Sequence, residues 1–397
     1  MDFALPLVGV RLSEVPLYVV RVVALYAVAT LGFDIIHFTL HRFLHTRSRA
    51  LRLLGGLHQH HHDFLGPDLR FDDTKTRANF VYHRIPEFCS QVAIILLALP
   101  IAGTKTVAFT LVLVTITFLE TTRRRGRDSN HVDFDVVPPL RAGLLVGPAY
   151  HAFHHVYPDR YLSSFSTMFD LIRGTGCQIA GRRFVISGAS GSFGAPFKEM
   201  LEREGAASVV PIKFGVDYTY EDYSRLEPVF READVLVLSH GAKGEQAMAA
   251  NCDSFLEMIE RFSALHQGQK VPIEIWAVGS EIECHPAWGN PELQRYLESK
   301  RAYARRARWY YHHGSFTYRH IVPSAFTSKM GPGLISGRTA AAIAMFFIKR
   351  GFHYVPVTYS GIALLNWFKF FFRLHAAPPP GRAGELPAAS SGESPAT

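Results

Sequence analysis

The stretches His37-Phe-Thr-Leu-His41, His58-Gln-His60-His61-His62 and His151-Ala-Phe-His154-His155 determine the fold of the first half of the chain. In a helix, positions i, i+3 and i+4 lie on one face. Eight of these imidazoles can therefore point into one space if three helices meet there. His60 lies at i+2 and falls off that face. The pattern predicts a helical bundle built around a cluster of histidines.

The residue type in this cluster indicates a metal site. Neutral imidazole suits iron, zinc and copper, and facing helices of a bundle commonly supply such ligands. A structural zinc site needs only about four ligands. The larger number favours two metal ions in one pocket, and iron is the metal whose chemistry uses such a pair. A single histidine is more often an ordinary core or surface residue, but two HxxHH motifs and one HxxxH argue against coincidence.

These motifs resemble those of the fatty acid hydroxylase/sterol desaturase superfamily, whose members are membrane di-iron oxygenases. Two flanking elements add to the resemblance, Phe169-Asp170-Leu-Ile-Arg-Gly174-Thr175 after the third motif and Asn130-His131-Val-Asp-Phe-Asp135 before it. The resemblance covers about residues 15–176 and implies an all-α membrane domain over residues 1–176 that holds two iron ions. The implied ligands are His37, His41, His58, His61, His62, His131, His151, His154 and His155.

Four acids lie close to these motifs in the sequence. A carboxylate that accepts the distal N–H of a ligating imidazole would fix the orientation of the ring. We expect this role of Asp135 and Asp170 and interpret Asp34 and Asp63 as solvated acids.

The composition favours a membrane protein with a basic cytoplasmic face. The 397 residues carry a net charge of +8, only 19% are charged, and no recognisable nucleic-acid module accompanies the basic residues. Residues 16–36 are long and apolar enough to cross a bilayer, whereas 88–101 and 107–121 are shorter. The shorter pair predicts a membrane hairpin or a re-entrant pair, with a buried helical pair of a soluble bundle as the alternative. The arginine-rich segment 123–127 places the histidines on the cytoplasmic side.

The four cysteines and the start of the chain fit that location. The cysteines are scattered, which argues against a disulfide framework and indicates a reducing, cytosol-facing protein. No basic region precedes the first apolar run, so we expect no cleavable signal peptide.

The second half of the chain alternates strand-like and helical segments. Phe184-Val-Ile-Ser187 leads into Gly188-Ala-Ser-Gly191-Ser-Phe-Gly194, which reads as a strand, a glycine turn and a helix start. Glycines at such a turn let a pyrophosphate approach the backbone N–H groups of the helix. Further strand-like segments occur at 235–238, 273–278 and 318–322. This alternation predicts an α/β fold with a Rossmann-like, doubly wound parallel sheet.

The glycine motif is followed in order by Asn251, Ser280, Tyr296-Leu-Glu-Ser-Lys300 and Pro323-Ser-Ala-Phe-Thr327. This order resembles the short-chain dehydrogenase/reductase family over about residues 182–358. The resemblance implies that Tyr296 is the general acid/base and that Lys300 lowers its pKa and holds the nicotinamide ribose. Ser280 would hydrogen-bond the substrate oxygen, and Asn251 would order a proton relay. The implied NAD(P) contacts are Gly188, Ser190, Gly191, Phe193, Gly194, Asp217, Gly241 and Thr327.

This half also departs from the family pattern. The glycines follow GxxGxxG, Ser239-His240-Gly241-Ala242 replaces Asn-Asn-Ala-Gly, and a strand and a helix are missing between Gly194 and Asp217. The shortened region is where NAD and NADP are distinguished, so Lys213 favours NADP only slightly. Each motif alone has an ordinary explanation, since YxxxK recurs by chance and Asn251 could cap a helix.

The end of the chain carries an apolar segment and a tail. Residues 359–375 are too short to span a bilayer, and we expect an apolar helix that lies in the membrane interface or docks on the membrane domain. A closing core helix is the alternative. Residues 376–397 are rich in Pro, Gly, Ser and Ala and are predicted to be disordered.

Together the two resemblances predict a bifunctional membrane oxidoreductase. The iron centre would use O2 to hydroxylate or desaturate a sterol or fatty-acyl lipid, and the NAD(P)-dependent domain would exchange hydride with an alcohol or carbonyl of that lipid. No haem motif or ferredoxin cysteine set is present, so an external donor of the ferredoxin, rubredoxin or cytochrome b5 type is implied. The alternatives are aldehyde-to-alkane chemistry like that of plant wax proteins, a catalytically silent membrane scaffold, and a soluble zinc hydrolase.

Overall fold

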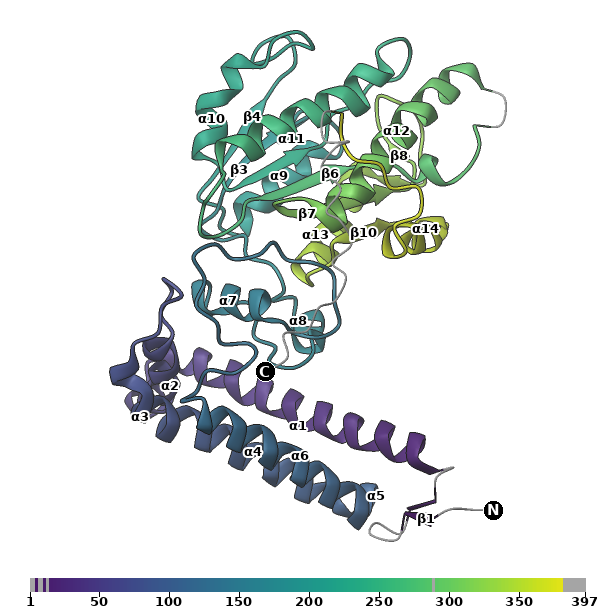
Figure 1. Cartoon of the computed structure of the whole chain (residues 1–397). Helices are drawn as coiled ribbons and strands as arrows, with labels where there is room; N and C mark the ends of the chain where they lie inside the picture. Colours follow the sequence, from purple (N-terminus) through teal and green to yellow (C-terminus); the bar gives the residue numbers. More distant parts are fainter. Residues whose placement is uncertain (1–3, 6–9, 12–13, 288–289, 381–397) are drawn as a thin grey trace. The chain divides into compact units, whose positions relative to one another are not determined.

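The computed structural model describes residues 4–5, 10–11, 14–287 and 290–380 (Figure 1). They divide into two compact units. The first unit comprises Met1–Val137, Ala142–Gln178 and Lys349–Gly351, and the second comprises Pro138–Arg141, Ile179–Ile348 and Phe352–Thr397. Most of the tail that is predicted to be disordered lies outside the described residues.

The first unit is a helical bundle, as the sequence predicts. The helices α1, α4 and α6 pack around an apolar core of Leu25, Ala29, Ile95, Val107 and Val114. The helices of this unit are α1 (Val15–Leu44), α2 (Arg49–Phe64), α3 (Thr76–Asn79), α4 (Ile85–Leu97), α5 (Leu99–Ala102), α6 (Thr104–Arg123), α7 (Pro148–Val156) and α8 (Met168–Arg173). A π-helical turn, η3 (Phe80–Arg84), joins α3 to α4, and the short strands β1 (Ala4–Leu5) and β2 (Val10–Arg11) pair near the start of the chain.

The helices α1 and α6 are long and apolar enough to cross a membrane. Many of their apolar side chains are exposed: Leu17, Val19, Val20, Val23, Val28, Ile35, Ile36, Val112, Ile116 and Leu119. Water would penalise so much contiguous apolar surface, whereas lipid would not. The first unit is therefore membrane-associated. The apolar runs 88–101 and 107–121 fall in α4–α5 and α6, which form a hairpin that turns at Gly103, where φ is +78°.

A glycine sets the distance between the two helices that carry the first two histidine motifs. A Cβ at Gly55 of α2 would lie 2.8 Å from the Leu40 carbonyl oxygen and 2.9 Å from the Leu44 backbone nitrogen of α1. Only glycine fits such a close backbone approach. The next turn of α2 therefore carries His58, His61 and His62 close against the end of α1.

The second unit contains the predicted parallel sheet. Its six strands run in the order β10-β7-β6-β5-β3-β4, and every neighbouring pair is parallel. The strands are β3 (Arg183–Ser187), β4 (Ser208–Ile212), β5 (Val235–Leu238), β6 (Glu274–Val278), β7 (Thr317–Pro323) and β10 (Tyr354–Val357). Strand order reverses at β3, whose neighbours are β4 and β5. Ligands of doubly wound sheets bind beyond the strand ends at such a reversal.

Helices connect the strands and cover the sheet. They are α9 (Gly194–Arg203), α10 (Glu227–Glu232), α11 (Ser254–Leu265), α12 (Pro291–His313), α13 (Gly337–Lys349) and α14 (Ile362–Phe371), with a second π-helical turn, η5 (Ala249–Asp253), before α11. The short strands β8 (Phe326–Thr327) and β9 (Ile335–Ser336) pair with each other in the loop after β7. Only one strand, β4, separates the glycine motif from Asp217, as the sequence spacing predicts.

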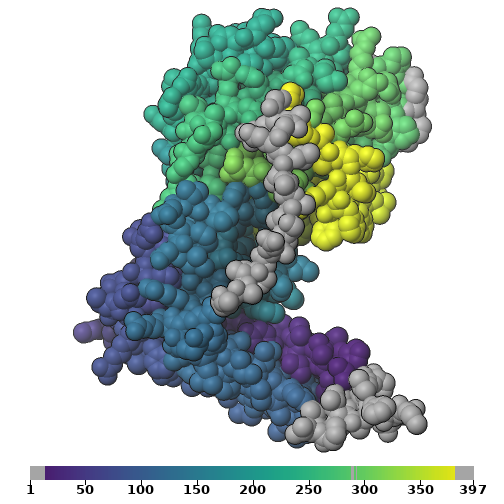
Figure 2. All heavy atoms as spheres, viewed as in Figure 1, coloured from purple at the N-terminus to yellow at the C-terminus, as the bar shows by residue number. Residues whose placement is uncertain are grey.

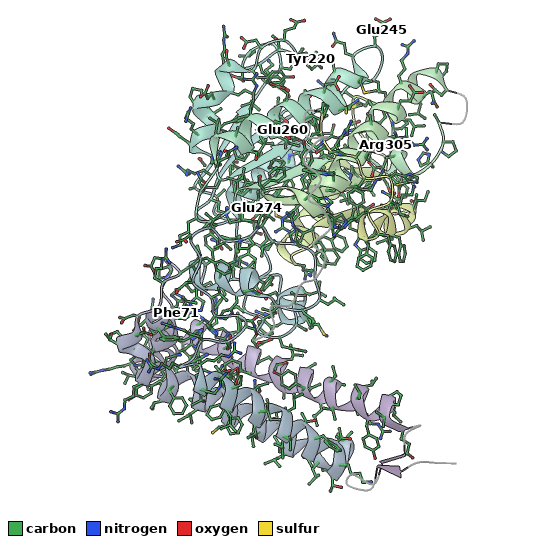
Figure 3. All side chains as sticks on the ribbon, in the orientation of Figure 1. Phe71, Tyr220, Glu245, Glu260, Glu274 and Arg305 are labelled. Carbon is green, nitrogen blue, oxygen red and sulfur yellow. The ribbon has the colours of Figure 1, made fainter. Side chains whose placement is uncertain are left out.

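The sheet buries one ionic cluster. Glu274, labelled in Figure 3, is fully buried on β6 and accepts hydrogen bonds from Arg182, from Arg319 Nε at 3.0 Å and from Trp276 Nε1 at 2.9 Å. Although burial disfavours the charged form, the two arginines lower the pKa of Glu274 to about 2. The cluster thus satisfies its charges internally and links β6 to β7 and to the residue that precedes β3.

Candidate functional site

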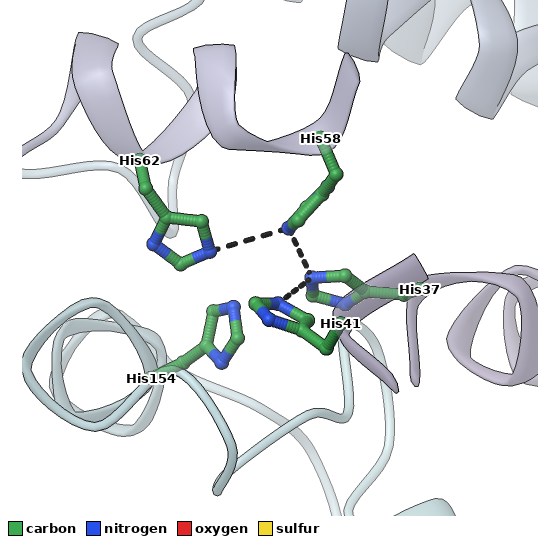
Figure 4. A group of neighbouring side chains, drawn as sticks. All are labelled: His37, His41, His58, His62 and His154. Carbon is green, nitrogen blue, oxygen red and sulfur yellow. Dashed lines mark hydrogen bonds between the residues drawn. The ribbon is translucent and has the colours of Figure 1, made fainter. Parts of the chain in front are cut away.

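All nine predicted metal ligands come together in the first unit, and all nine are buried. They fall into two groups. The first holds His37, His41, His58, His62 and His154 (Figure 4), and the second holds His61, His131, His151 and His155. Within each group the candidate ligand atoms lie within 4.8 Å of one another. His60 belongs to neither group and stacks on Tyr82 with ring centroids 4.8 Å apart.

In both groups the Nε2 atoms face one another. In the first group, His58 Nε2 lies 2.7 Å from His37 Nε2 and 3.2 Å from His62 Nε2 (Figure 4). In the second group, His151 Nε2 lies 2.9 Å from His131 Nε2 and 3.2 Å from His155 Nε2. The groups adjoin, since the His62 and His155 ring centroids are 4.9 Å apart. Converging imidazole nitrogens of this kind suit the binding of transition-metal ions.

Burial favours the neutral form of the six imidazoles that α2 and α7 supply. Desolvation lowers the pKa of His58, His61, His62, His151 and His155 well below the ordinary value and lowers that of His154 to about 4. At neutral pH each ring therefore keeps a lone pair for a metal. Among the described residues, His154 Nε2 has no hydrogen-bond partner although it is buried. Such an atom is costly unless something binds it, and a metal ion in the first group would do so.

Three contacts fix the rings from behind. Asp128 Oδ1 lies 2.8 Å from His131 Nδ1, Asn79 Oδ1 lies 3.3 Å from His61 Nδ1, and the Arg160 carbonyl oxygen lies 3.0 Å from His154 Nδ1. Because each of these oxygens can accept the N–H, it leaves Nε2 as the ligand atom. Asp128 and Asn79 have no motif spacing, so sequence patterns did not reveal them.

The expected roles of the nearby acids are wrong in three of four cases. Asp135 is exposed and pairs with Arg70, so it orients no imidazole. Asp170 is buried but accepts hydrogen bonds from the Leu162 and Ser163 backbone nitrogens at 2.9 and 2.8 Å, and so shapes the loop after α7. Asp34, interpreted as solvated, is buried and accepts from the Ser164 backbone nitrogen at 2.9 Å.

His83 is a residue of the site that sequence reasoning missed. Its buried ring stacks on His61 with centroids 3.9 Å apart and lies 5.1 Å from the His58 ring. It lies in the π-helical turn η3, where an extra residue in the turn shifts the direction of the side chains. No second histidine lies three or four positions from His83, so the sequence around it shows no histidine motif.

In the second unit, the glycine motif forms the turn between β3 and α9. Gly188 has a φ of +71°, and a Cβ there would lie 2.6 Å from the His240 backbone nitrogen. A Cβ at Gly194 would lie 2.1 Å from the Gly188 carbonyl oxygen. Ser190 and Gly191 are exposed at the tip of the turn, and Phe193 is buried, with its ring stacked on Phe197 at 5.2 Å. The turn thus presents backbone at the start of α9, where a phosphate group can bind.

Ser280, Tyr296 and Lys300 also come together. The Tyr296 hydroxyl hydrogen-bonds to Ser280, and Lys300 Nζ lies 5.8 Å from the Tyr296 ring centroid and donates to the Val278 carbonyl oxygen at 3.0 Å. Burial raises the pKa of Tyr296 to about 12 and lowers that of Lys300 to about 8. Burial therefore shifts the tyrosine pKa in the direction opposite to that expected from Lys300.

The other predicted residues of this unit have structural contacts of their own. Asn251 lies in the turn η5, donates to the Ala242 carbonyl oxygen at 2.7 Å and accepts from the Ala242 backbone nitrogen at 3.1 Å. Its side chain is thereby committed to the loop after β5, next to Gly241, and the relay role of Asn251 stays a prediction. Asp217 accepts from the Lys213 backbone nitrogen at 2.7 Å, and exposed Thr327 donates to the Gly333 carbonyl oxygen at 3.0 Å.

A buried acid beside this pair was also missed. Glu283 Oε1 lies 3.3 Å from His320 Nε2 and accepts from Asn366 Nδ2 at 3.1 Å. Its negative charge contributes to the raised pKa of Tyr296, after burial, and opposes the lowering of the Lys300 pKa. Glu283 follows Ser280 by only three positions, but acids are common in loops, so no pattern singled it out.

Comparisons with known proteins agree with this division. The fatty acid hydroxylase family model matches residues 26–175, in the first half of the chain. The second half has a parallel-sheet, Rossmann-like fold, and the similar solved structures are short-chain dehydrogenases. Solved structures of that kind include one from Burkholderia cenocepacia in complex with NADP (17% identity, TM-score 0.41, 49% of this chain and 94% of that chain). Another comes from Burkholderia phymatum in complex with NAD (14% identity, TM-score 0.40, 51% and 98%).

A curated relative is similar to this chain over a longer segment than these solved structures are. Monoglucosyldiacylglycerol epimerase of Synechocystis is 27% identical in a 267-residue alignment that covers 60% of this chain and 64% of the relative. The match therefore spans slightly less than two thirds of that protein.

Proposed function

We propose that this protein is a membrane lipid oxidoreductase whose first half holds two iron ions and whose second half binds NAD(P). The observation that carries the proposal is the sorting of nine buried histidines into two adjoining groups with facing Nε2 atoms. The chain's fatty acid hydroxylase domain supports iron over other metals. The metal count and the lipid are part of the proposal.

The residues around the iron sites have distinct tasks. When bound, iron would supply O2-dependent hydroxylation or desaturation of a C–H bond. The histidines hold the metal, Asp128 and Asn79 fix His131 and His61, and the apolar surfaces of α1 and α6 bring a lipid to the site from the bilayer. The electrons come from an external ferredoxin, rubredoxin or cytochrome b5-type donor.

In the second half, Tyr296 exchanges a proton with the substrate oxygen. NAD(P) would take up the hydride of an alcohol and leave a carbonyl. Tyr296 in its phenolate form accepts the hydroxyl proton, and in the reverse reaction its protonated hydroxyl, which the raised pKa favours, donates to the carbonyl oxygen. Ser280 positions that oxygen. Hydroxylation by the first half creates the alcohol that the second half needs, which gives the fusion a chemical reason.

The epimerase relative supports a second candidate function. A dehydrogenase that oxidises a sugar hydroxyl and returns the hydride to the other face would invert that carbon in a glycolipid headgroup. Mass spectrometry distinguishes the two. Hydroxylation adds one oxygen atom and stops without O2, whereas epimerisation gives an isomer of unchanged mass in the absence of O2.

We also propose that α14 anchors the second unit in the membrane interface. Leu364, Leu365, Phe368, Phe371 and Phe372 are exposed on and next to this helix, whereas Ala363, Asn366 and Phe370 are buried (Figure 2, yellow atoms). Lys369 and Arg373 supply basic groups beside the apolar face. The L365S/F368S variant should reduce quenching of Trp367 fluorescence by brominated lipid in vesicles, and unchanged quenching would contradict this anchor.

The test of the main proposal uses the full chain in lipid nanodiscs. We expect about two irons per chain and loss of O2-dependent lipid oxidation in H155A, while H155A still oxidises a supplied lipid alcohol. Y296F should accumulate the alcohol. A metal-free protein that nevertheless oxidises lipid, or a wild type that yields no product from hydroxylated lipid, would contradict the coupled reaction.

A further inference from the structure

A pocket of about 420 Å³ lies beside the second histidine group and within the first unit. Its buried residue Asn79 contacts His61, and Arg84, which also lines it, follows His83, the residue that stacks on His61. One layer of side chains therefore separates the pocket from the histidine centre. The lining residues are Asp73, Thr74, Thr76, Arg77, Asn79, Phe80, Arg84, Thr121, Thr122, Arg125 and Gly126.

The positive charge of the pocket is uncompensated. Within the described part of the chain, Arg77 and Arg125 make no ion pair. The neighbouring arginines differ, because Arg84 pairs with Glu87, Arg127 pairs with Asp73, and Arg123 and Arg124 pair with Glu120. The two guanidinium groups that remain offer several N–H donors in a geometry that suits phosphate or another oxyanion.

The threonines of the pocket can accept hydrogen bonds from a ligand but have no free hydroxyl hydrogen to donate. Their hydroxyl hydrogens are already donated: Thr74 to Asp72 Oδ1 at 2.6 Å, Thr76 to Asp73 O at 2.9 Å, Thr121 to Thr117 O at 2.9 Å and Thr122 to Phe118 O at 2.7 Å. The hydroxyl oxygens can therefore only accept further hydrogen bonds. A ligand that suits this pocket carries both an anionic group and hydroxyl groups.

The position of the pocket suits a lipid. Thr121 and Thr122 lie at the end of α6, which is long and apolar enough to span a bilayer. The ends of such a helix lie at the level of the lipid headgroups. A concave site of this volume is typical of small-molecule binding. It therefore suits a lipid headgroup better than it suits the surface of a partner protein.

We propose that this pocket binds the headgroup of an acidic lipid that bears hydroxyl groups, of the phosphatidylglycerol type, and that this lipid is the substrate of the histidine centre. Arg77 and Arg125 bind the phosphate, and the threonine oxygens accept the glycerol hydroxyls. The substrate part rests on the proposed oxygenase function, whereas the binding part does not.

Binding is measured by calorimetry on the full chain in detergent with dihexanoylphosphatidylglycerol, dihexanoylphosphatidylcholine or inorganic phosphate as the probe. We expect the glycerol lipid to bind at least tenfold more tightly than the other two. R77Q/R125N should weaken its binding at least tenfold; asparagine is chosen because Arg125 has a φ of +56°. R123Q/R124Q is the matched control, with the same loss of charge in the same region outside the pocket, and should bind within threefold of the wild type.

Equal losses in the two double variants would overturn the site, as would equally tight binding of the choline lipid. Inorganic phosphate binding as tightly as the lipid would overturn the headgroup assignment in favour of a free anion. Iron content of R77Q/R125N should match that of the wild type, while the KM for oxidation of the glycerol lipid rises. An acidic lipid that binds but is never oxidised by an iron-loaded protein would refute its role as substrate. Absence of iron would contradict the proposed function and leave the binding result intact.

Discussion

The histidine centre of the first unit and the Tyr296 site of the second unit are both buried polar sets, but they are built differently. In the histidine centre all nine predicted side chains converge, and their functional atoms face one another. In the second unit only Ser280, Tyr296 and Lys300 converge, while Asn251, Asp217 and Thr327 are engaged in local turns. Side chains placed by helix periodicity are thus more predictable than side chains placed by loops.

The largest effect is expected from removal of a histidine of the second group. H61A takes a facing nitrogen from His131 and leaves His83 without its stacking partner. We expect about one iron or fewer per chain and a loss of lipid oxidation of at least about 100-fold. Metal analysis and product analysis measure both. H60A is the control, because His60 lies outside both groups, and equal losses in the two variants would refute the division.

Removal of the proton-transfer group should have a large effect confined to the second unit. Y296F deletes the hydroxyl bound to Ser280, and oxidation of a supplied lipid alcohol should fall by about 10²- to 10⁴-fold. Iron content and nucleotide binding should not change. The reaction is followed by NAD(P)H absorbance. Normal turnover of Y296F would mean that the resemblance to the dehydrogenases does not extend to their chemistry.

A smaller effect is expected from the residues that orient the ligands. D128A leaves His131 Nδ1 without its acceptor, which should weaken iron binding by about 10- to 100-fold. D135A is the control. Asp135 also lies near His131 in the sequence, but it pairs with Arg70 on the surface. Competition with a chelator compares the two variants. If D135A were the more damaging, orientation by Asp128 would be wrong.

The smallest effect concerns pH. Burial lowers the pKa of Lys300 from 10.5 to about 8, so between these values the unfolded chain binds a proton that the native protein has lost. Stability should therefore rise with pH in this range, by at most about 3 kcal/mol for this group. Above about pH 10 the raised pKa of Tyr296 acts in the opposite direction. Thermal unfolding of the wild type and K300M at several pH values measures the difference, and an equal slope in both variants would refute it.

The sequence by itself determined which side chains of a motif lie together when their spacing matches a local period. HxxxH and HxxHH place imidazoles on one face of a helix, and YxxxK places Tyr296 and Lys300 one turn apart on α12. The tight GxxGxxG turn forms because glycine has no Cβ to clash with the neighbouring backbone. These relations involve only neighbours along the chain. Fold class in both halves follows from the same short-range patterns.

The tertiary structure alone decided how those residues are grouped. The assignment of His61 to one group and His62 to the other depends on the close crossing of α1 and α2 at Gly55 and on the approach of α7, which no local period encodes. His83 and Asn251 lie in π-helical turns, where one extra residue changes the direction of a side chain. Asn79 and Glu283 contact His61 and His320, imidazoles that lie far from them in the sequence. Packing between segments that are distant in the sequence, and not local propensity, fixed each of these contacts.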